Sequence, residues 1–233
     1  SSTGHAIGQI FGLLDDGLFT DADFVDGELI EGIPEHTFSP VRPGDIKYKD
    51  VNEDGVINDL DRTAIGGTWN PQIVYGFGLN LQYKNIDFGF FFQGNAKTNR
   101  MIGGSNFIPG SGDGSMGNIM SNYQDHWTVD NPSQDVFYPR LHYGNSNNSN
   151  NYRASTWWLR NMDYLRLKQF NIAYNLPENT LKSVGVKGAR IYLMGTNLLT
   201  FSKFKLWDPE VYSSNGAAYP NVMSCSLGVN FSF

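Results

Sequence analysis

The sequence predicts an all-β chain whose strands, about six in number, belong to a large antiparallel transmembrane β-barrel with long extracellular loops. The composition favours sheets, because 14% of the 233 residues are aromatic, 26 are glycine and only 17% are charged. Two patterns favour a barrel. Several segments of roughly ten residues alternate apolar and polar side chains, and the connections between them are alternately long and short.

The last segment, residues 221–233, shows the alternation most clearly. Successive side chains of a strand point to opposite faces of the sheet, so this segment has one apolar and one polar face. The chain then stops on Phe233. An apolar-outward strand with a terminal phenylalanine resembles the closing strand of a bacterial outer-membrane barrel, with Phe231 and Phe233 as its C-terminal signal. The predicted apolar face consists of Cys225, Leu227, Val229, Phe231 and Phe233.

Five earlier segments are also predicted as strands, and they are residues 5–19, 72–83, 86–95, 164–176 and 189–200. The second is the most regular: Tyr75, Phe77 and Leu79 alternate with Gly76 and Gly78. Its length suits a tilted strand that crosses a bilayer. The two-residue turn at 84–85 makes a hairpin of the second and third segments.

The connections predict which ends of the strands meet. Residues 20–71, 96–163 and 201–220 are long connections, whereas 84–85 and 177–188 are short. In an up-and-down antiparallel sheet, alternate connections lie at opposite ends, so all long loops gather at one end, as in outer-membrane barrels. Six strands are fewer than the roughly eight that a transmembrane barrel needs. We therefore expect further strands from elsewhere, and the start at Ser1 suggests a piece of a longer precursor.

Composition and motifs also exclude several classes of function. The formal net charge of -6 argues against a general nucleic-acid binder, which needs a basic surface. The single cysteine, Cys225, excludes an internal disulfide framework and a cysteine-based zinc site. The sequence has no apolar run of about 18 residues that would suit a transmembrane helix. The four histidines are scattered without a catalytic pattern, so we expect no enzyme.

Residues 50–61, inside the predicted extracellular loop 20–71, follow the spacing of a calcium-binding loop. Oxygen donors occupy loop positions 1, 3, 5, 9 and 12, Gly55 is at position 6, and position 7 offers a backbone carbonyl. Position 12 is Asp61 rather than the usual, longer glutamate, as in dockerin-like loops, which this segment resembles. The alternative is a polar surface turn without metal. The predicted ligands of a structural Ca²⁺ are Asp50, Asn52, Asp54, Val56, Asn58 and Asp61.

Three tryptophans, Trp157, Trp158 and Trp207, lie near the ends of predicted strands. Tryptophans in such places form aromatic girdles at membrane interfaces, which is the interpretation we favour. The alternative is that they are substrate contacts that stack on sugar rings. The sequence leaves both interpretations open.

Several short phrases, taken in order, resemble the C-terminal part of SusC/RagA-type TonB-dependent outer-membrane transporters. Each phrase is weak alone, but their order and spacing cover nearly the whole chain. They are GDIKY at 44–48, DVNEDG at 50–55, Arg62, IG at 65–66, NP at 70–71, YGF at 75–77, FFQG at 91–94, YLRLK at 164–168, YNLP at 174–177, GTNL at 195–198 and DPE at 208–210.

The resemblance implies a barrel of about 22 strands with an N-terminal plug. It also implies import of glycan oligosaccharides or peptides across the outer membrane of Bacteroidota-type bacteria, powered through TonB, with a SusD-type surface lipoprotein as partner. No plug or TonB-contacting segment is recognised in residues 1–233. We therefore expect this chain to supply the last strands and several extracellular loops. Its expected partners are the N-terminal remainder of the barrel, the lipoprotein, TonB through that remainder, and outer-membrane lipid, but no nucleic acid.

Two alternatives remain open at this point. The chain could be a soluble, calcium-stabilised β-sandwich that binds carbohydrate through its tryptophans. It could also belong to a barrel that serves protein export or assembly rather than import. Dependence on lipid or detergent separates the sandwich from both barrels, because the sandwich would bury its apolar faces.

Overall fold

The computed structural model of this chain describes residues 3–104, 107–109, 120–142, 148–177 and 185–233. The chain forms two compact units, each assembled from several segments. Unit 1 combines Ser1–Asn70, Asn99–Arg160 and Ser213–Ala217, and unit 2 combines Pro71–Thr98, Asn161–Tyr212 and Ala218–Phe233. Most of the two longest predicted loops therefore belongs to unit 1, and five of the six predicted strands belong to unit 2.

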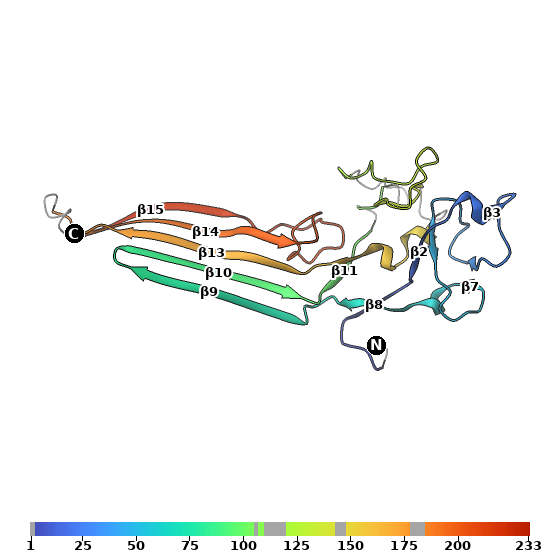
Figure 1. Ribbon diagram of the computed structural model, residues 1–233, viewed down its shortest axis with the longest axis horizontal. Coiled ribbons are helices and arrows are strands. Elements are labelled where there is room, and N and C mark those ends of the chain that lie inside the picture. Colours follow the sequence, from blue (N-terminus) through green and yellow to red (C-terminus); the bar gives the residue numbers. More distant parts are fainter. Residues whose placement is uncertain (1–2, 105–106, 110–119, 143–147, 178–184) are drawn as a thin grey trace. The chain divides into compact units, whose positions relative to one another are not determined.

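Unit 2 contains one antiparallel sheet of five long strands (Figure 1). Its spatial order is β15-β14-β13-β10-β9, so β9 and β15 are the two edges. The all-β fold class is confirmed. No helix in the described part of the chain is long and apolar enough to cross a membrane. The strands are β9 (Ile73–Tyr83), β10 (Ile86–Ala96), β13 (Tyr164–Asn175), β14 (Gly188–Ser202) and β15 (Ser224–Ser232).

The register places all long connections at one end of this sheet. Ile73 pairs with Ala96, and Tyr164 pairs with both Asn95 and Ser202, so the residues that adjoin the long connections lie together. At the other end Tyr83 pairs with Ile86, next to the two-residue turn. The predicted segregation of long and short connections is confirmed. Residues 178–184 of the second short connection lie outside the described residues.

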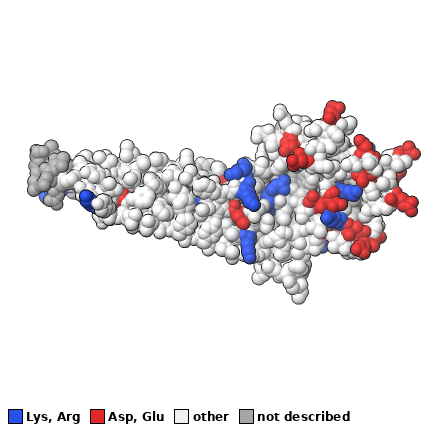
Figure 2. All heavy atoms as spheres, in the orientation of Figure 1, with Lys and Arg blue, Asp and Glu red and all other residues white. Residues whose placement is uncertain are grey.

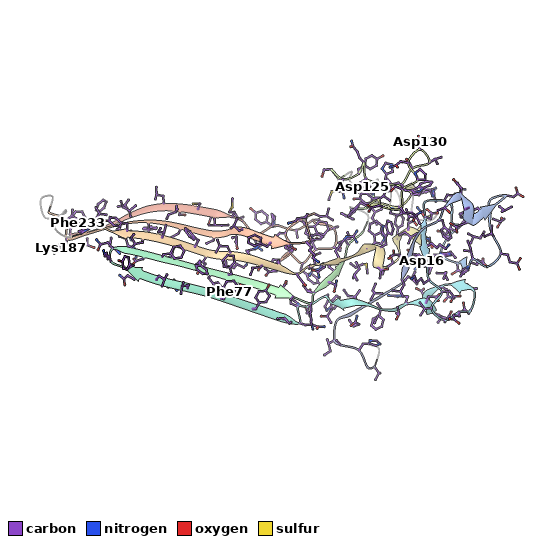
Figure 3. The ribbon with its side chains drawn as sticks, in the orientation of Figure 1. Asp16, Phe77, Asp125, Asp130, Lys187 and Phe233 are labelled. Atoms are coloured by element: carbon purple, nitrogen blue, oxygen red, sulfur yellow. The ribbon has the colours of Figure 1, made fainter. Side chains whose placement is uncertain are left out.

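One face of the sheet is apolar across all five strands. Leu79 of β9 pairs with Phe90 of β10, which pairs with Phe170 of β13, and the same face continues through Leu193 to Leu227. The leucines of this layer are exposed, with Leu79 at 44% and Leu227 at 76%, whereas Phe90 and Phe170 are half-buried. Figure 2 shows few charged atoms over these strands, and Figure 3 shows side chains along them, with Phe77 labelled on β9. Nothing in the described chain covers this apolar face.

The opposite face carries polar residues and glycines, and a few large rings pack against the glycines. A Cβ atom at Gly78 would approach the Phe90 carbonyl oxygen to 2.6 Å and the Phe91 ring to 3.0 Å, so the Phe91 ring needs a glycine beside it. A Cβ atom at Gly228 would lie 2.3 Å from the Tyr192 ring. We call this side of the sheet the polar face.

The first predicted strand, residues 5–19, does not join the five-stranded sheet, so that part of the prediction is wrong. The segment instead forms β1 (Gln9–Gly12), which pairs with β8 (Thr63–Thr68), and β2 (Asp15–Leu18), which pairs with β6 (Ile46–Tyr48). The physical reason is a set of contacts with distant residues. Between β1 and β2, the Leu13 N–H donates to the Ala154 carbonyl at 2.9 Å, and the Leu13 carbonyl accepts the N–H of Thr156 at 3.0 Å.

Unit 1 has short strand pairs around a hydrophobic core of its own. The largest buried side chains in it include Phe19, Phe107, Tyr138 and Trp158. The predicted loops are therefore folded structures. The remaining strands are β3 (Phe24–Val25), β4 (Glu28–Leu29), β5 (Glu35–His36), β7 (Val56–Ile57), β11 (Asn99–Met101) and β12 (Leu159–Asn161). The described 3-10 helices are η1 (Asp21–Asp23), η2 (Asp59–Asp61), η4 (Ser149–Tyr152) and η5 (Thr156–Trp158).

The two faces of β9 predict opposite responses to charge. Leu79→Arg places a cation on the apolar face in the middle of the strand, and in a bilayer this costs about 2–4 kcal/mol. Asn80→Arg places the same side chain on the polar face at nearly the same depth. We expect the first variant to reduce the amount of folded full-length protein in the outer membrane and the second to leave it near normal, as measured by heat-modifiable gel mobility. Equal losses for both variants would contradict the assignment of faces.

Candidate functional site

The loop at residues 50–61 is wound around the side chain of Asp50. One carboxylate oxygen, Oδ1, accepts the backbone N–H of Glu53 at 2.7 Å, and Oδ2 accepts that of Gly55 at 2.7 Å. The tight turn requires two residues with positive φ, Glu53 at 61° and Gly55 at 82°. Asp54 continues the winding, because its Oδ1 accepts the N–H of Val56 at 2.9 Å. The predicted sharp turn at position 6 is thus present.

Asp61 closes the loop from inside. Its side chain is fully buried, and its two carboxylate oxygens accept the backbone N–H groups of Val51 at 2.9 Å and Asn58 at 2.8 Å. Asn58 caps η2 by accepting the N–H of Leu60 at 2.7 Å. Asp61 therefore joins the two ends of the loop through hydrogen bonds.

The donor set of this loop matches what Ca²⁺ prefers, since carboxylate, amide and carbonyl oxygens of one short segment surround one turn. Asp54 is exposed and Asp50 is half-buried. Asp50 Oδ2 and Asp54 Oδ1 each accept one backbone N–H and so keep a second lone pair. Among the described residues, however, no three His, Cys, Asp or Glu side chains come close enough together to hold a metal ion. The calcium assignment stays a prediction.

The loop is joined to the rest of unit 1 through β5 and β7, which pair in parallel. The N–H of Glu35 donates to the Gly55 carbonyl at 3.1 Å, and the Thr37 hydroxyl donates to the Ile57 carbonyl at 2.9 Å. His36 lies between these bonds and is buried, and burial lowers its pKa to about 4. The neutral ring accepts the N–H of Tyr48 through Nε2. A neutral histidine thus ties β5 to β6 at physiological pH.

A buried ion pair organises the centre of unit 1. Asp45 is fully buried, and the Arg140 guanidinium donates to both of its oxygens at 2.9 Å. Asn151 donates to Asp45 Oδ1 at 2.9 Å and accepts the N–H of Ile46 at 2.8 Å. Burial raises the pKa of Asp45, whereas Arg140 and the hydrogen bonds act in the opposite direction. The carboxylate thus binds two residues that lie 95 and 106 positions away in the sequence.

The three predicted tryptophans occupy different environments. Trp158 is 1% exposed, and its Nε1 donates to the Asn151 carbonyl at 2.8 Å. Its ring therefore cannot lie in a membrane interface or stack on an external sugar, because it packs into the core of unit 1. Trp157 is half-buried and donates to the Phe137 carbonyl at 3.3 Å. Trp207 is also half-buried and packs edge-on against Phe204 in unit 2, with ring centroids 4.9 Å apart.

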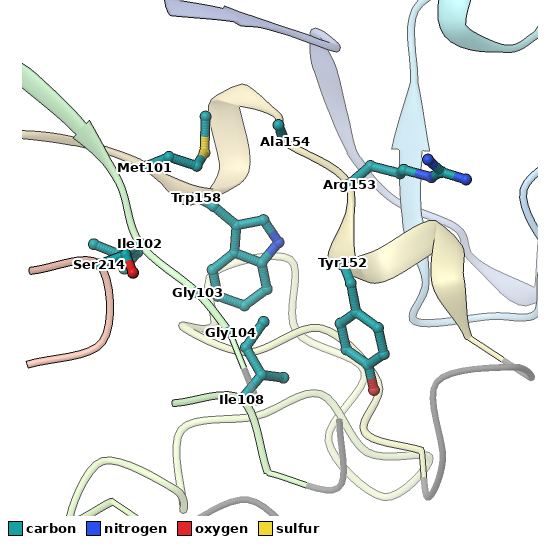
Figure 4. A pocket seen from close by; sticks show the side chains of 10 residues that line it. All are labelled: Met101, Ile102, Gly103, Gly104, Ile108, Tyr152, Arg153, Ala154, Trp158 and Ser214. Atoms are coloured by element: carbon teal, nitrogen blue, oxygen red, sulfur yellow. The ribbon is translucent and has the colours of Figure 1, made fainter. Parts of the chain in front are cut away.

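Unit 1 contains a cavity of about 490 Å³ beside Trp158 (Figure 4). Its walls include Ile102, Ile108 and Tyr152, and Figure 4 shows the Arg153 guanidinium pointing away from the tryptophan. The Arg153 guanidinium carbon instead lies 3.9 Å from the Phe38 ring centroid. Burial raises the pKa of Tyr152 to about 12, so the phenol stays neutral. The cavity is a mostly uncharged hollow next to the core.

A second charged group, which sequence reasoning missed, lies on the polar face of unit 2. We call Arg166, Lys168, Asp208 and Glu210 the Arg166 cluster. Arg166 pairs with Asp208 and, at 3.2 Å, with Glu210, and Lys168 Nζ lies 2.7 Å from Glu210. Both halves belong to the phrases YLRLK and DPE, but nothing in the sequence shows that they meet. The sequence did offer one signal: Arg166 and Lys168 are the only charged residues of β13, and cations on such a strand need anionic partners.

No family model matches this chain. The TonB-dependent receptor P26 of Formosa agariphila is 33% identical over 205 aligned positions, covering 82% of this chain and 20% of that receptor. The TonB-dependent receptor P3 of the same organism is 28% identical over 244 aligned residues, covering 99% of this chain and 22% of that receptor. The receptor SusC of Bacteroides thetaiotaomicron is 26% identical and covers 82% of this chain and 18% of SusC. The chain spans about a fifth of the length of these relatives.

A solved structure of the RagAB peptide transporter has the same fold. It superimposes with a TM-score of 0.68 at 24% identity, over 97% of this chain and 22% of that chain. The RagAB peptide importer in its closed-closed state gives a TM-score of 0.65 over the same share of this chain. At this identity the likeness concerns the fold, which extends over both units.

The buried ion pair predicts a large effect of removing one partner. Arg140→Met leaves Asp45 buried without its cation, and breaking a buried pair costs about 3–5 kcal/mol. Arg62→Met is the matched control, because Arg62 is exposed and its guanidinium makes a long, 3.5 Å contact with the Phe11 carbonyl. Pulse proteolysis of the full-length protein in urea should show early cleavage within unit 1 for the first variant only. Asp45→Asn added to Arg140→Met should restore part of the loss, and failure to do so would contradict the electrostatic cause.

Proposed function

This chain is a segment of a TonB-dependent receptor of the SusC/RagA type, and we propose that it supplies strands and long extracellular loops to an outer-membrane importer. The observation that carries the proposal is the sheet of unit 2, which has one exposed apolar face and two edges that each pair on one side only among the described residues. In lipid, unpaired edges are not tolerated, so the edges need further strands. The remaining length of the relatives offers them.

The apolar face supports a membrane location. Large side chains such as Phe77, Ile172 and Val229 are exposed in a continuous layer, and water would make such a surface aggregate. The hydrocarbon of a bilayer is a favourable environment for this apolar surface. The backbone N–H and C=O groups within the sheet are hydrogen-bonded between strands, as lipid requires. We infer that the sheet is part of the barrel wall in the outer membrane, with outer-membrane lipid against the apolar face and the lumen against the polar face.

The soluble sandwich is disfavoured by the same sheet. A sandwich buries the inner faces of two sheets against each other. The described residues contain one long sheet and only two-stranded pairs beside it, and its apolar face is exposed. The burial of Trp158 also removes one of the rings that a carbohydrate-binding sandwich would have used. An export or assembly barrel is less favoured than an importer, because the relatives bear the names of receptors and transporters.

The proposed partners follow from the family. They are the N-terminal remainder of the barrel with its plug, TonB through that remainder, and a SusD-type surface lipoprotein. The proposed cargo is glycan oligosaccharide or peptide; RagAB, with the same fold, is a peptide transporter. We assign no catalytic role to the chain. Unit 1 would then be the extracellular part, and its own core explains how such long connections hold a defined shape.

We also propose that residues 50–61 bind a structural Ca²⁺. The ligands would be Asp50, Asn52, Asp54, the Val56 carbonyl and Asn58, with Asp61 at position 12. The ion would neutralise the acidic side chains of the loop and would fix the segment that β7 joins to β5. The support is the spacing of the donors together with the observed winding around Asp50.

Purification of the full-length receptor tests the importer proposal. Extracted from the native outer membrane in mild detergent, the receptor should retain a surface lipoprotein, identified by mass spectrometry. Cells should take up labelled oligosaccharides or labelled peptides only when the receptor gene is present, and a protonophore should abolish that uptake. A water-soluble protein free of detergent would contradict the proposal, and so would uptake of both cargo classes that is independent of the receptor.

Calorimetric titration of the purified full-length receptor with CaCl₂ tests the metal site. The double variant Asp50→Asn, Asp54→Asn should bind one Ca²⁺ fewer than the native receptor, because two of the charged ligands are lost. Asp59→Asn is the matched control: it removes the same charge per residue from an exposed position of the same loop that is not a predicted ligand. If both variants retain the native stoichiometry, the loop is a turn without metal.

A further inference from the structure

The Arg166 cluster holds a loop against the polar face of the sheet. Arg166 pairs across the sheet with Gln93 of β10 and Thr200 of β14, which places it on the polar face. A guanidinium on an exposed sheet face would be solvated, but Arg166 is only 2% exposed. Its partners Asp208 and Glu210 come from the β14–β15 loop, residues 203–223. The beginning of this loop therefore covers the polar face at Arg166.

The same two carboxylates also hold the returning end of the loop. The backbone N–H of Asn221 donates to Asp208 at 3.2 Å, and its side-chain amide donates to Glu210 at 2.9 Å. Asp208 in addition accepts the N–H of Glu210 at 3.0 Å. Both ends of the loop thus meet on two acidic residues that are paired with strand β13. We call residues 207–210 together with Asn221 the loop base.

The energetics make this attachment firm. Arg166 is desolvated, and a buried cation that loses its partners is strongly unfavourable. The loop base therefore cannot leave without exposing Arg166 to solvent or leaving it unpaired. Burial raises the pKa of Asp208, but the hydrogen bond from Arg166 and backbone N–H groups outweigh it and keep the pKa below its usual value. The cluster holds two cations and two anions, so it presents little net charge.

We propose that Arg166 is a positioning residue that fixes the loop base as a strap on the lumen side of the barrel wall, at the end where the long loops emerge. The inference rests on the proposed function only in that the polar face borders the lumen. The strap narrows the path from outside to the polar-face residues farther along the strands. Thr196 and Ser224 form the next pair beyond it, and Met194 and Ser226 lie farther still from the loop end.

The labelling rate of a single cysteine on the far side of the strap measures whether the strap is in place. In the full-length receptor, Cys225→Ser removes the native thiol, and Ser226→Cys places a new one on the polar face. Intact cells are treated with a membrane-impermeant maleimide, and the labelling rate is measured in three further backgrounds. Arg166→Met breaks the attachment, and Arg166→Lys keeps the charge. Arg190→Met is the matched control, because it breaks the 3.2 Å pair with Asp87 on the same face without touching the loop.

We expect labelling several-fold faster with Arg166→Met, a rate near native with Arg190→Met, and an intermediate rate with Arg166→Lys. Hydrogen exchange of the purified receptors should show faster exchange of the Glu210 and Asn221 amides in Arg166→Met only. Unchanged labelling in Arg166→Met overturns the strap, and an equal rise in both methionine variants shows general loosening and also overturns it. Failure of the proposed function is distinguishable, because it would appear as loss of energised uptake or of membrane location in the native receptor.

Discussion

The antiparallel register of the five long strands is the constraint on which the rest of the structure depends. Because a strand turns alternate side chains to opposite sides, one fixed register assembles a continuous apolar face and a continuous polar face at once. Leu79, Phe90 and Phe170 come from three strands and lie side by side on the apolar face. A slip of one residue would move leucine and phenylalanine to the polar face and asparagine to the apolar face. The glycines beneath Phe91 and Tyr192 maintain the close approach of the chains.

Two buried groups of charged residues fix the positions of segments that hydrophobic packing alone does not fix. In unit 1, Asp45 and Arg140 join two parts of the chain that are 95 residues apart, and the Asn151 side chain donates a further hydrogen bond to Asp45. In unit 2, the Arg166 cluster attaches a loop to a sheet face that has no apolar layer to hold it. Both groups are buried ion pairs, and each favours one arrangement of the chain. Any other arrangement would leave a charged side chain buried without its partner.

The division into two units explains how a barrel segment can carry such long connections. A loop of some fifty residues without structure is uncommon in a compact protein. Here the connections share a core that includes Phe19, Tyr138 and Trp158, and backbone hydrogen bonds are satisfied by short strand pairs. This organisation gives the connections a defined shape. The predicted calcium loop belongs to the same unit through β5 and β7.

The strands of the sheet could be predicted from the sequence, because alternation in β9, β10, β13 and β15 is local and period two is visible without a partner. The segregation of long connections followed from chain order alone, and the winding of residues 50–61 followed from local hydrogen bonds around Asp50. Only the tertiary structure showed that residues 5–19 leave the sheet, that Trp158 is core, and that Arg166 meets Asp208. Each of these depends on contacts between residues far apart in the chain, and no local pattern encodes them. In this protein the buried ion pairs join residues that are far apart in the sequence, whereas the alternation of apolar and polar side chains is visible within each strand.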